Sequence, residues 1–387
     1  MNNAKKFSGT GFAVLLAGLI VTILPFALRA QIAAPTPPDI NAKGYLLLDF
    51  HSGRVLASKN PDERLDPASI TKLMTAYAVF RAIQSGQLSL DDEVLVSEKA
   101  WRTPGSRMFI EVGKRVPVKQ LLPGMIIQSG NDASVALAEH VAGTEASFAE
   151  VMNQLAAELG MTNTRYQNST GLPAEEHYTS ATDIAILASA LINEFPDYYR
   201  WYSQKQFTYN GITQGNRNAL LWRDETVDGM KTGYTESAGY CLVSSAERDG
   251  MRLISVVLGT KSPAARANES QALLNFGFRF FETPLLWDKD EVIENVRVWK
   301  GTEEATSLIV TEPVYATIPR GALDSLETDA TFPAQIIAPV SASNSLGTIS
   351  ARVGDETVAT ADLYSSKSVD EGSLVQIAWD EVLLWFE

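Results

Sequence analysis

The sequence is poor in the residues that build redox and metal sites. Of its 387 residues, one is cysteine and three are histidine. A single cysteine cannot form an internal disulfide, and Cys241 lies in an apolar, strand-like stretch, where cysteine is usually buried and unreactive. The histidines, His51, His140 and His177, lie in turn-, helix- and loop-like contexts, and no Gly-x-Ser-x-Gly pattern occurs. A Ser-His-Asp hydrolase is therefore poorly supported.

Positive charge is also scarce, with 32 lysines and arginines against 46 acidic residues and a formal net charge of −14. The first 30 residues contain Lys5, Lys6 and Arg29 but no acid, so the rest of the chain has a net charge of about −17. Such an acidic surface opposes binding to nucleic acid and to anionic lipid.

Long apolar runs are missing except near the N-terminus, where one extends from about Phe12 to Leu28. It follows two lysines and precedes Arg29-Ala30. This basic, apolar, small-residue order predicts a secretory signal peptide over residues 1–30, with cleavage after Ala30. The alternative is an uncleaved membrane anchor, because the run is close to the length that spans a bilayer. Both interpretations predict an exported protein.

Three short motifs follow in order: Ser69-Ile70-Thr71-Lys72, Ser129-Gly130-Asn131 and Lys231-Thr232-Gly233. A serine hydroxyl is a weak nucleophile unless a neighbouring base removes its proton. In Ser-x-x-Lys the two residues are three positions apart, which on a helix places both side chains on one face. Each motif alone has a structural explanation, but this ordered combination is typical of class A β-lactamases and penicillin-binding proteins. The motifs predict an acyl-enzyme site that needs no histidine, no metal and no other cofactor.

The first motif is preceded by helix-start signals. Asp66 is a good N-cap and Pro67 suits the first helical position. Apolar residues follow at helical spacing until Gly86, which predicts a buried helix that ends there. Ser69 then lies in the first turn, where backbone N–H groups favour developing negative charge.

Strand-like stretches flank a largely helical middle. Residues 44–49 and 54–58 are predicted to form one hairpin, and residues 240–246 and 252–259 a second. Residues 87–225 are predicted to be mostly helices and loops, with helices at 146–159 and 182–195, and another helix follows at 263–281. We predict an α/β (α+β) domain, in which an antiparallel sheet from the two chain ends carries an inserted helical cluster. Lys231 would lie on an outer strand, beside the start of the Ser69 helix.

The composition changes near residue 283. Short alternating runs over residues 283–372 predict a small all-β sandwich domain without a catalytic cluster, which serves as a spacer or interaction module. Residues 373–387 are predicted to form an amphipathic helix that is apolar over about half its circumference. An in-plane membrane anchor would have such a face, although its polar side is usually basic and this one is acidic. The alternative is that the helix packs on the protein itself.

With these residues in place, the sequence resembles the low-molecular-mass penicillin-binding proteins that act as serine-type D-alanyl-D-alanine carboxypeptidases. The similarity extends from about Tyr45 to the end of the chain. It includes Asp66–Ser69, Gln128–Asp132, Asn216–Asn218, Val227–Gly229, Lys231–Gly233 and Gly277–Thr283. The domain organisation is then a signal peptide (1–30), a linker (31–43), a penicillin-binding D,D-peptidase domain (44–282), a β-domain (283–372) and an amphipathic helix (373–387).

The resemblance implies a hydrolase that removes the terminal D-alanine from peptidoglycan stem peptides and is inhibited covalently by β-lactams. It also implies a periplasmic location, with peripheral contact to the outer face of the inner membrane through the C-terminal helix.

The resemblance also implies residue roles. Ser69 would attack the substrate carbonyl with Lys72 as its base, kept partly neutral by burial and by the cation Lys231. Ser129 would relay the proton to the leaving amine. The implied substrate-binding residues are Asn131 for the amide, Thr232, Arg266 and Arg217 for the carboxylate, Gly233 for close approach of the peptide, and the N–H groups of Ser69 and Tyr234 for the oxyanion.

Two departures from the family pattern stand out. Many relatives carry histidine after Lys-Thr-Gly, where this chain has Tyr234, so a different deacylation rate is expected. The loop Trp101–Met108 is also shorter than in some members, so its residues cannot be assigned by analogy.

Three alternatives share part of the pattern. A class A β-lactamase needs a glutamate in Glu-x-x-Leu-Asn, and here Gln271 takes that position before Leu274-Asn275. A D,D-endopeptidase would share all three motifs but usually lacks the second domain. A catalytically silent peptidoglycan-binding scaffold is opposed by the intact Ser69 and Lys72.

Overall fold

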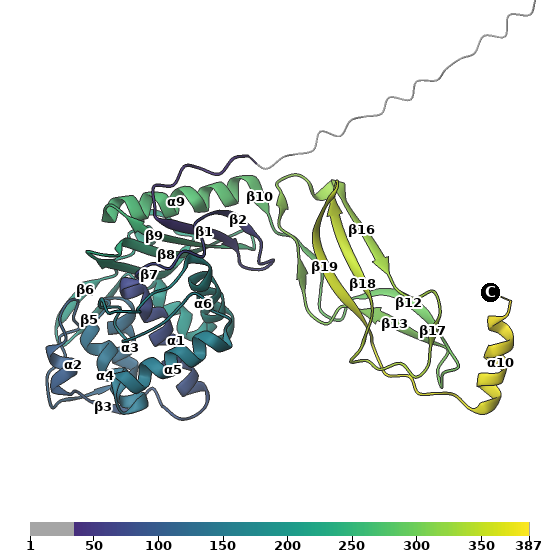
Figure 1. Cartoon of the computed structure of the whole chain (residues 1–387), viewed down its shortest axis with the longest axis horizontal. Helices are drawn as coiled ribbons and strands as arrows, with labels where there is room; N and C mark the ends of the chain where they lie inside the picture. The colour runs from purple at the N-terminus through teal and green to yellow at the C-terminus, as the bar shows by residue number, and fades with distance from the viewer. Residues whose placement is uncertain (1–34, 387) are drawn as a thin grey trace, which may run out of the picture. The chain divides into compact units, whose positions relative to one another are not determined.

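The computed structural model describes residues 35–386 (Figure 1). The predicted signal peptide, 1–30, and the start of the predicted linker lie outside the described residues. Within residues 35–386, the helices are all too short or too polar to cross a membrane.

A five-stranded antiparallel sheet organises the first part of the chain, with strand order β2-β1-β9-β8-β7. The strands are β1 (Gly44–Asp49), β2 (Val55–Lys59), β7 (Val227–Thr235), β8 (Gly239–Arg248) and β9 (Met251–Thr260). Both predicted hairpins are present, and the sheet joins the two ends of the domain as predicted. Strand β7 is an edge strand, so the prediction for Lys231 is confirmed.

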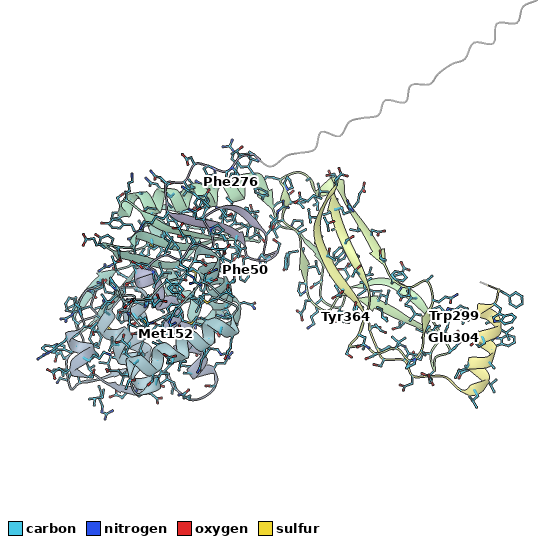
Figure 2. The ribbon with its side chains drawn as sticks, viewed as in Figure 1. Phe50, Met152, Phe276, Trp299, Glu304 and Tyr364 are labelled. Atoms are coloured by element: carbon cyan, nitrogen blue, oxygen red, sulfur yellow. The ribbon has the colours of Figure 1, made fainter. Side chains whose placement is uncertain are left out.

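The sheet is covered on both faces, because its apolar residues alternate in direction. Leu46 and Ile254 contribute to the core shared with the helical cluster, whereas Leu47 and Leu253 pack in the core under α9. Figure 1 shows α9 on one face and the other long helices on the opposite face. In Figure 2, Met152 marks the helical cluster and Phe276 marks α9. Cys241, on β8, is buried as expected.

The helices agree with the capping signals in most places. Thr144, Ser180 and Ser262 each accept a hydrogen bond from the backbone N–H of the third residue after them. The helical elements are η1 (Ala68–Thr71), α1 (Lys72–Gln84), α2 (Glu98–Arg102), α3 (Val118–Ile126), α4 (Asn131–Ala142), α5 (Glu145–Glu158), α6 (Ala181–Glu194), α7 (Pro196–Tyr199), η2 (Arg200–Ser203), α8 (Leu220–Arg223) and α9 (Pro263–Phe280).

One local prediction is wrong and another is incomplete. Asp66 does not cap the Ser69 helix, because Pro67 occupies the N-cap position without a side-chain bond and the chain enters through the 3-10 turn η1. Residues 87–225 also contain two short antiparallel strand pairs besides helices, one on either side of α2 and one a hairpin. These pair β3 (Glu93–Leu95) with β4 (Arg115–Pro117), and β5 (Gln206–Tyr209) with β6 (Ile212–Gly215). Strands of three or four residues carry too little alternation to be recognised in the sequence.

The second part of the chain is all β, as predicted. Its main sheet has the order β16-β18-β19-β13-β12-β17, with β12 and β17 parallel. Two two-stranded ribbons, β10-β15 and β11-β14, accompany it. The strands are β10 (Phe281–Glu282), β11 (Leu285–Trp287), β12 (Val292–Trp299), β13 (Ala305–Ile309), β14 (Val314–Tyr315), β15 (Ile318–Pro319), β16 (Leu326–Thr331), β17 (Ile336–Ile337), β18 (Ser345–Val353) and β19 (Glu356–Ser365), with a 3-10 turn η3 (Leu323–Ser325).

The chain ends in helix α10 (Leu374–Leu384), which Ser373 opens with a capping box. Its acidic side faces the β-domain: Asp380 accepts a hydrogen bond of 2.5 Å from the backbone N–H of Lys300, and Glu381 pairs with the ammonium of Lys300 at 2.8 Å. Its apolar side chains are exposed, including Trp379 at 65% and Trp385 at 88%. The helix therefore contacts the domain through polar groups and leaves its apolar face uncovered.

Candidate active site

The nucleophile and its base are neighbours, as the first motif predicts. Ser69 lies in η1, and Lys72 begins α1. The Lys72 Nζ atom lies 3.0 Å from Ser69 Oγ, which is hydrogen-bond distance for proton transfer.

Lys72 is buried, and its amine is held by two further acceptors. Nζ donates to Asn131 Oδ1 at 2.7 Å and to the carbonyl oxygen of Thr170 at 2.5 Å. Burial, and next the positive charge of Arg217, lower the pKa of Lys72 to about 7. The sequence analysis expected the charge of Lys231 to lower the pKa of Lys72, but in the structure this charge belongs to Arg217. A lysine with this pKa is partly neutral near pH 7 and can accept a proton.

The second serine and the second lysine also meet. Lys231 Nζ donates to Ser129 Oγ at 2.8 Å and to the carbonyl oxygen of Thr232 at 3.0 Å. Burial, followed by the charges of Lys72 and Arg217, holds the pKa of Lys231 well below its usual value. The second serine–lysine pair thus repeats the arrangement of the first, and Asn131 adds to the first pair through its bond to Lys72.

The turns that carry these serines have unusual backbone conformations. Ala68, next to the nucleophile, has φ of 47°, and Ser129 has φ of 67°. A left-handed conformation costs residues other than glycine of the order of 1–2 kcal/mol, so the surrounding contacts must hold it in place. Such strain is common in active sites.

Two glycines allow other segments to approach η1 closely. A Cβ on Gly171 (φ +82°) would lie 1.8 Å from the carbonyl oxygen of Ala68. A Cβ on Gly233 would lie 3.0 Å from the carbonyl oxygen of Pro67. Gly233 therefore lets the edge strand β7 pack against η1, and its predicted contact with a substrate peptide stays a prediction.

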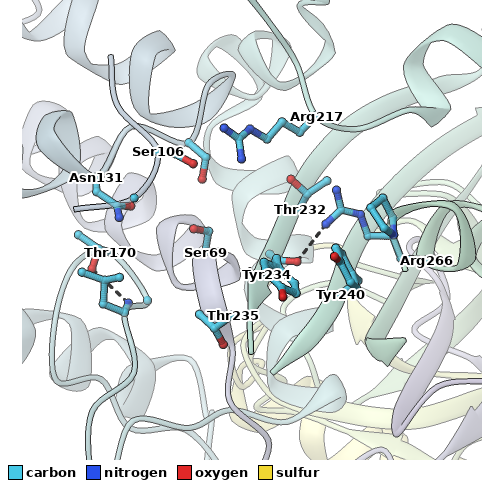
Figure 3. Close-up of a pocket in the computed structure, with 16 residues that line it drawn as sticks. Ser69, Ser106, Asn131, Thr170, Arg217, Thr232, Tyr234, Thr235, Tyr240 and Arg266 are labelled. Atoms are coloured by element: carbon cyan, nitrogen blue, oxygen red, sulfur yellow. Dashed lines mark hydrogen bonds between the residues drawn. The ribbon is translucent and has the colours of Figure 1, made fainter. Parts of the chain in front are cut away.

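A cleft of about 470 Å³ opens above Ser69 (Figure 3). It gathers eight residues that the sequence analysis singled out: Ser69, Ser129, Asn131, Arg217, Thr232, Gly233, Tyr234 and Arg266. Lys72 and Lys231 lie beneath it, in contact with the two serines. The structure thus brings all the predicted site residues together.

The cleft has a cationic region formed by Arg217 and Arg266. The Arg266 guanidinium donates to the carbonyl oxygen of Gly233 at 3.0 Å and lies 5.7 Å from the centre of the Tyr240 ring. Burial lowers the pKa of both arginines from its ordinary value. Arginine nevertheless stays protonated in proteins, so the two guanidinium groups place positive charge here. This region can bind an anionic group such as a carboxylate.

Tyr234 forms an aromatic wall together with Tyr240. Their rings stack with centroids 4.2 Å apart, and Tyr234 is 54% exposed at the cleft. Tyr234 directly follows Lys231-Thr232-Gly233, so the wall places a phenol at the end of the third motif.

The sequence analysis gave the Trp101–Met108 loop no role, and the structure places its residues Gly105 and Ser106 at the other side of the cleft. The carbonyl oxygen of Ser106 accepts from the backbone N–H of Asn131 at 2.7 Å, and that of Pro104 accepts from Asn131 Nδ2 at 2.6 Å. The buried Asp132 carboxylate accepts from the backbone N–H groups of Met108 and Phe109, both at 2.8 Å. The signal available in the sequence was the acid directly after Ser129-Gly130-Asn131.

Thr170 was also missed, because it acts through its backbone carbonyl. Asn168 forms the turn that presents it, since Asn168 Oδ1 accepts from the N–H groups of Thr170 and Gly171 at 3.1 and 2.8 Å. An Asn-Ser-Thr-Gly turn between two helices is a signal for a tight loop, but not for a contact with Lys72.

Comparisons with known proteins show which family the chain resembles. A family model described as D-alanyl-D-alanine carboxypeptidase matches residues 31–262, and one described as penicillin-binding protein 5, C-terminal domain, matches residues 281–371. The chain is 43% identical over 390 residues to the D-alanyl-D-alanine carboxypeptidase DacC of Escherichia coli K12, with 97% of this chain and 98% of that protein covered.

Solved structures are similar as well. Penicillin binding protein 5 from Haemophilus influenzae has a TM-score of 0.84 at 39% identity, covering 87% of this chain and 100% of that one. Penicillin-binding protein D2 from Listeria monocytogenes in its ampicillin-bound form has a TM-score of 0.59 at 30% identity, covering 63% of this chain and 100% of that one.

Proposed function

The chain belongs to the D-alanyl-D-alanine carboxypeptidase family, and on that premise we propose that Ser69, Lys72, Ser129 and Lys231 carry its reaction. The protein is a serine-type carboxypeptidase that hydrolyses peptides ending in D-alanyl-D-alanine. The observation that carries the residue assignment is the distance of 3.0 Å between Lys72 Nζ and Ser69 Oγ.

In the proposed reaction, Ser69 Oγ attacks the carbonyl carbon of the terminal peptide bond and its proton passes to Lys72. The bond to the leaving D-alanine breaks, and the leaving amine takes a proton through Ser129, which Lys231 orients at 2.8 Å. Water then hydrolyses the acyl–Ser69 ester, releasing the shortened peptide and restoring the serine. The backbone N–H groups of Ser69 and Tyr234 would stabilise the oxyanion.

We assign substrate binding to the residues around the nucleophile. Arg266, with Thr232 and Arg217, would bind the terminal carboxylate, because these arginines place positive charge in the cleft. Asn131 would bond the substrate amide, and Gly233 would let the peptide lie along the edge of β7. A β-lactam would acylate Ser69 in the same way, which the ampicillin-bound relative supports.

The proposal extends to location and domain organisation. The segments 1–30, 31–43, 44–282, 283–372 and 373–387 would be signal peptide, linker, peptidase domain, β-domain and amphipathic helix. The protein would be exported to the periplasm and act on peptidoglycan stem peptides. Helix α10 would bind the outer face of the inner membrane, which the exposure of Trp379 and Trp385 supports.

Ser69→Ala tests the function. The mature protein should release D-alanine from a purified pentapeptide, detected by mass spectrometry, and should take up fluorescent penicillin covalently. The variant should do neither while melting at the wild-type temperature, and Ser106→Ala, in the same cleft, should keep both activities. Labelling of Ser69→Ala at the wild-type rate would contradict the assignment.

A further inference from the structure

A buried carboxylate outside the three motifs reaches toward the base lysine. Glu145 is the first residue of α5, yet its side chain turns away from solvent and is only 8% exposed as a residue. Oε2 pairs with Lys99 Nζ at 2.8 Å. Oε1 accepts from both the backbone N–H of Ser169 at 3.1 Å and its hydroxyl at 2.8 Å. Both carboxylate oxygens are therefore engaged.

The backbone N–H and carbonyl groups of Ser169 are held from three helices. While Glu145 of α5 holds its N–H side, its carbonyl oxygen accepts from Thr75 Oγ1 of α1 and from Ser134 Oγ of α4, each at 2.7 Å. The next carbonyl along the chain is that of Thr170, which accepts from Lys72 Nζ at 2.5 Å. The Ser169 and Thr170 carbonyls belong to successive residues. The position of Ser169 therefore determines where the Thr170 carbonyl, which accepts from Lys72, lies.

An ordinary role at the helix terminus does not account for this arrangement. Thr144 already caps α5 by accepting from the N–H of Ser147 at 3.0 Å, and a first-turn acid usually remains in solvent. Burying a carboxylate is costly unless it is paired and hydrogen-bonded, and Glu145 obtains those partners from Lys99 and Ser169.

We propose that Glu145 is a positioning residue of the active site, whose carboxylate holds the 168–171 turn so that the Thr170 carbonyl keeps the Lys72 amine against Ser69. This inference rests on the proposed roles of Ser69 and Lys72. Glu145 would act on Lys72 indirectly, through its hydrogen bonds to Ser169 and through the carbonyl of the next residue, Thr170.

The charge of Glu145 also acts on Lys72. It raises the pKa of Lys72, in opposition to burial and to Arg217. Lys72 interacts electrostatically with five charged or titratable groups. They are Asp132 of α4, Glu145 of α5, His177, Arg217 and Lys231 of β7. Loss of one negative charge from this set lowers the pKa of Lys72, whatever happens to the turn.

Two variants separate the two effects. Glu145→Gln keeps an oxygen that can accept from Ser169 but loses the charge, whereas Glu145→Ala loses both. The matched control is Glu158→Ala, because Glu158 ends the same helix with a 60% exposed side chain and a long contact of 3.7 Å to Arg81.

The measurement is the second-order rate of acylation by fluorescent penicillin as a function of pH, with a thermal melt of each variant. We expect Glu145→Ala to acylate about tenfold more slowly, which corresponds to losing roughly one hydrogen bond in the transition state. Glu145→Gln should retain most of the rate, and in both variants the acidic limb of the profile should move to lower pH. Glu158→Ala should match the wild type.

The proposal is overturned if Glu145→Ala is acylated at the wild-type rate. It is also overturned if the acylation rate of both variants falls only as much as the fraction of folded protein, and the acidic limb of the pH profile does not move. If Glu145→Ala fails to fold, Ser169→Ala takes its place, because it removes the hydroxyl bond to Glu145 and keeps the charge; it should acylate more slowly, and a wild-type rate would overturn the proposal. A wild-type chain that takes no label would instead overturn the proposed function, and the positioning role would fall with it.

Discussion

Arg266, on α9, donates a hydrogen bond of 3.0 Å from Nη1 to the backbone carbonyl oxygen of Gly233, on β7. The bond ties the helix after the sheet to the strand that carries the third motif. A guanidinium has five N–H donors in a fixed geometry, so the others remain to bind a planar carboxylate in the cleft.

Arg266→Ala should therefore raise KM for peptides that end in a carboxylate far more than for the same peptides with an amidated end. A hydrogen bond to a charged group contributes about 1.5–3 kcal/mol, which is a factor of roughly ten to a hundred in kcat/KM. Steady-state kinetics on the paired peptides measures it. Arg223→Ala, on the short helix α8, is the control and should change neither value. Equal losses on acid and amide substrates would show that Arg266 acts only through Gly233.

The pH dependence of acylation should report the protonation of Lys72. Because its pKa is lowered to about 7 and the neutral amine is the base, the acylation rate should rise as the pH increases through about 7. Arg217→Gln removes a positive charge that lowers the pKa of Lys72, so this pKa should rise. The acidic limb of the pH–rate profile, where the rate increases with pH, should then move to higher pH.

Rates of labelling by a β-lactam over a pH series check this shift. Because Arg217 also lies in the binding cleft, its loss can change the rate itself, so the readout is the pH position of the limb. Arg200→Gln, with a 73% exposed side chain, is the control and should leave the limb in place. A limb that stays put in Arg217→Gln, or moves to lower pH, would contradict the electrostatic assignment.

His177 should make the fold sensitive to mild acid. Its Nδ1 accepts from the N–H of Gln167 at 3.0 Å, so Nε2 carries the proton and donates to Thr71 at 2.9 Å. Burial, with a smaller contribution from Lys72, lowers the pKa of His177 to about 4, below the value near 6.5 of an unfolded chain.

The sign follows from proton uptake. Between about pH 6.5 and 4 the unfolded chain binds the proton and the folded chain does not, so this stabilisation is present above 6.5 and is lost as the pH falls. The loss should be about 1.4 kcal/mol per pH unit. His177→Gln should have a shallower decline, measured by denaturant unfolding at several pH values. Parallel curves for the two proteins would rule out this source of acid sensitivity.

Removal of residues 373–387 should move the mature protein from the membrane fraction to the soluble periplasm without lowering activity on short peptides. The acidic residues of α10 contact Lys300, and its exposed face carries tryptophans, so binding should depend on apolar burial. High salt should fail to release the full-length protein, while mild detergent should succeed.

Point variants sharpen the same test. Trp379→Ser combined with Trp385→Ser should weaken membrane association about as much as the deletion. Val292→Ser, at an exposed apolar position of β12, should not. A full-length mature chain that is soluble without detergent would contradict the anchor.

The proximity of Ser69 and Lys72 could be predicted from the sequence because it depends on a short-range pattern. Ser69 and Lys72 are three residues apart, so one helical turn brings them together whatever the rest of the chain does. Alternation in the strands at 44–49 and 252–259, and the cap at Thr144, likewise act over a few residues. For this reason the sheet, the main helices and the order of the two domains could be predicted.

Tertiary packing decided what depends on residues far apart in the chain. The charge that most affects the pKa of Lys72 comes from Arg217, 145 positions away by residue number, and the acceptor from Thr170 is a backbone carbonyl that no side-chain pattern reveals. The partners of Asp132 and Glu145 also come from other segments, with Met108 24 positions from Asp132 and Ser169 24 positions from Glu145. A buried carboxylate takes whichever donors the packing brings to it, and that choice is made only once α1, α4 and α5 have met around the turn at Ser169.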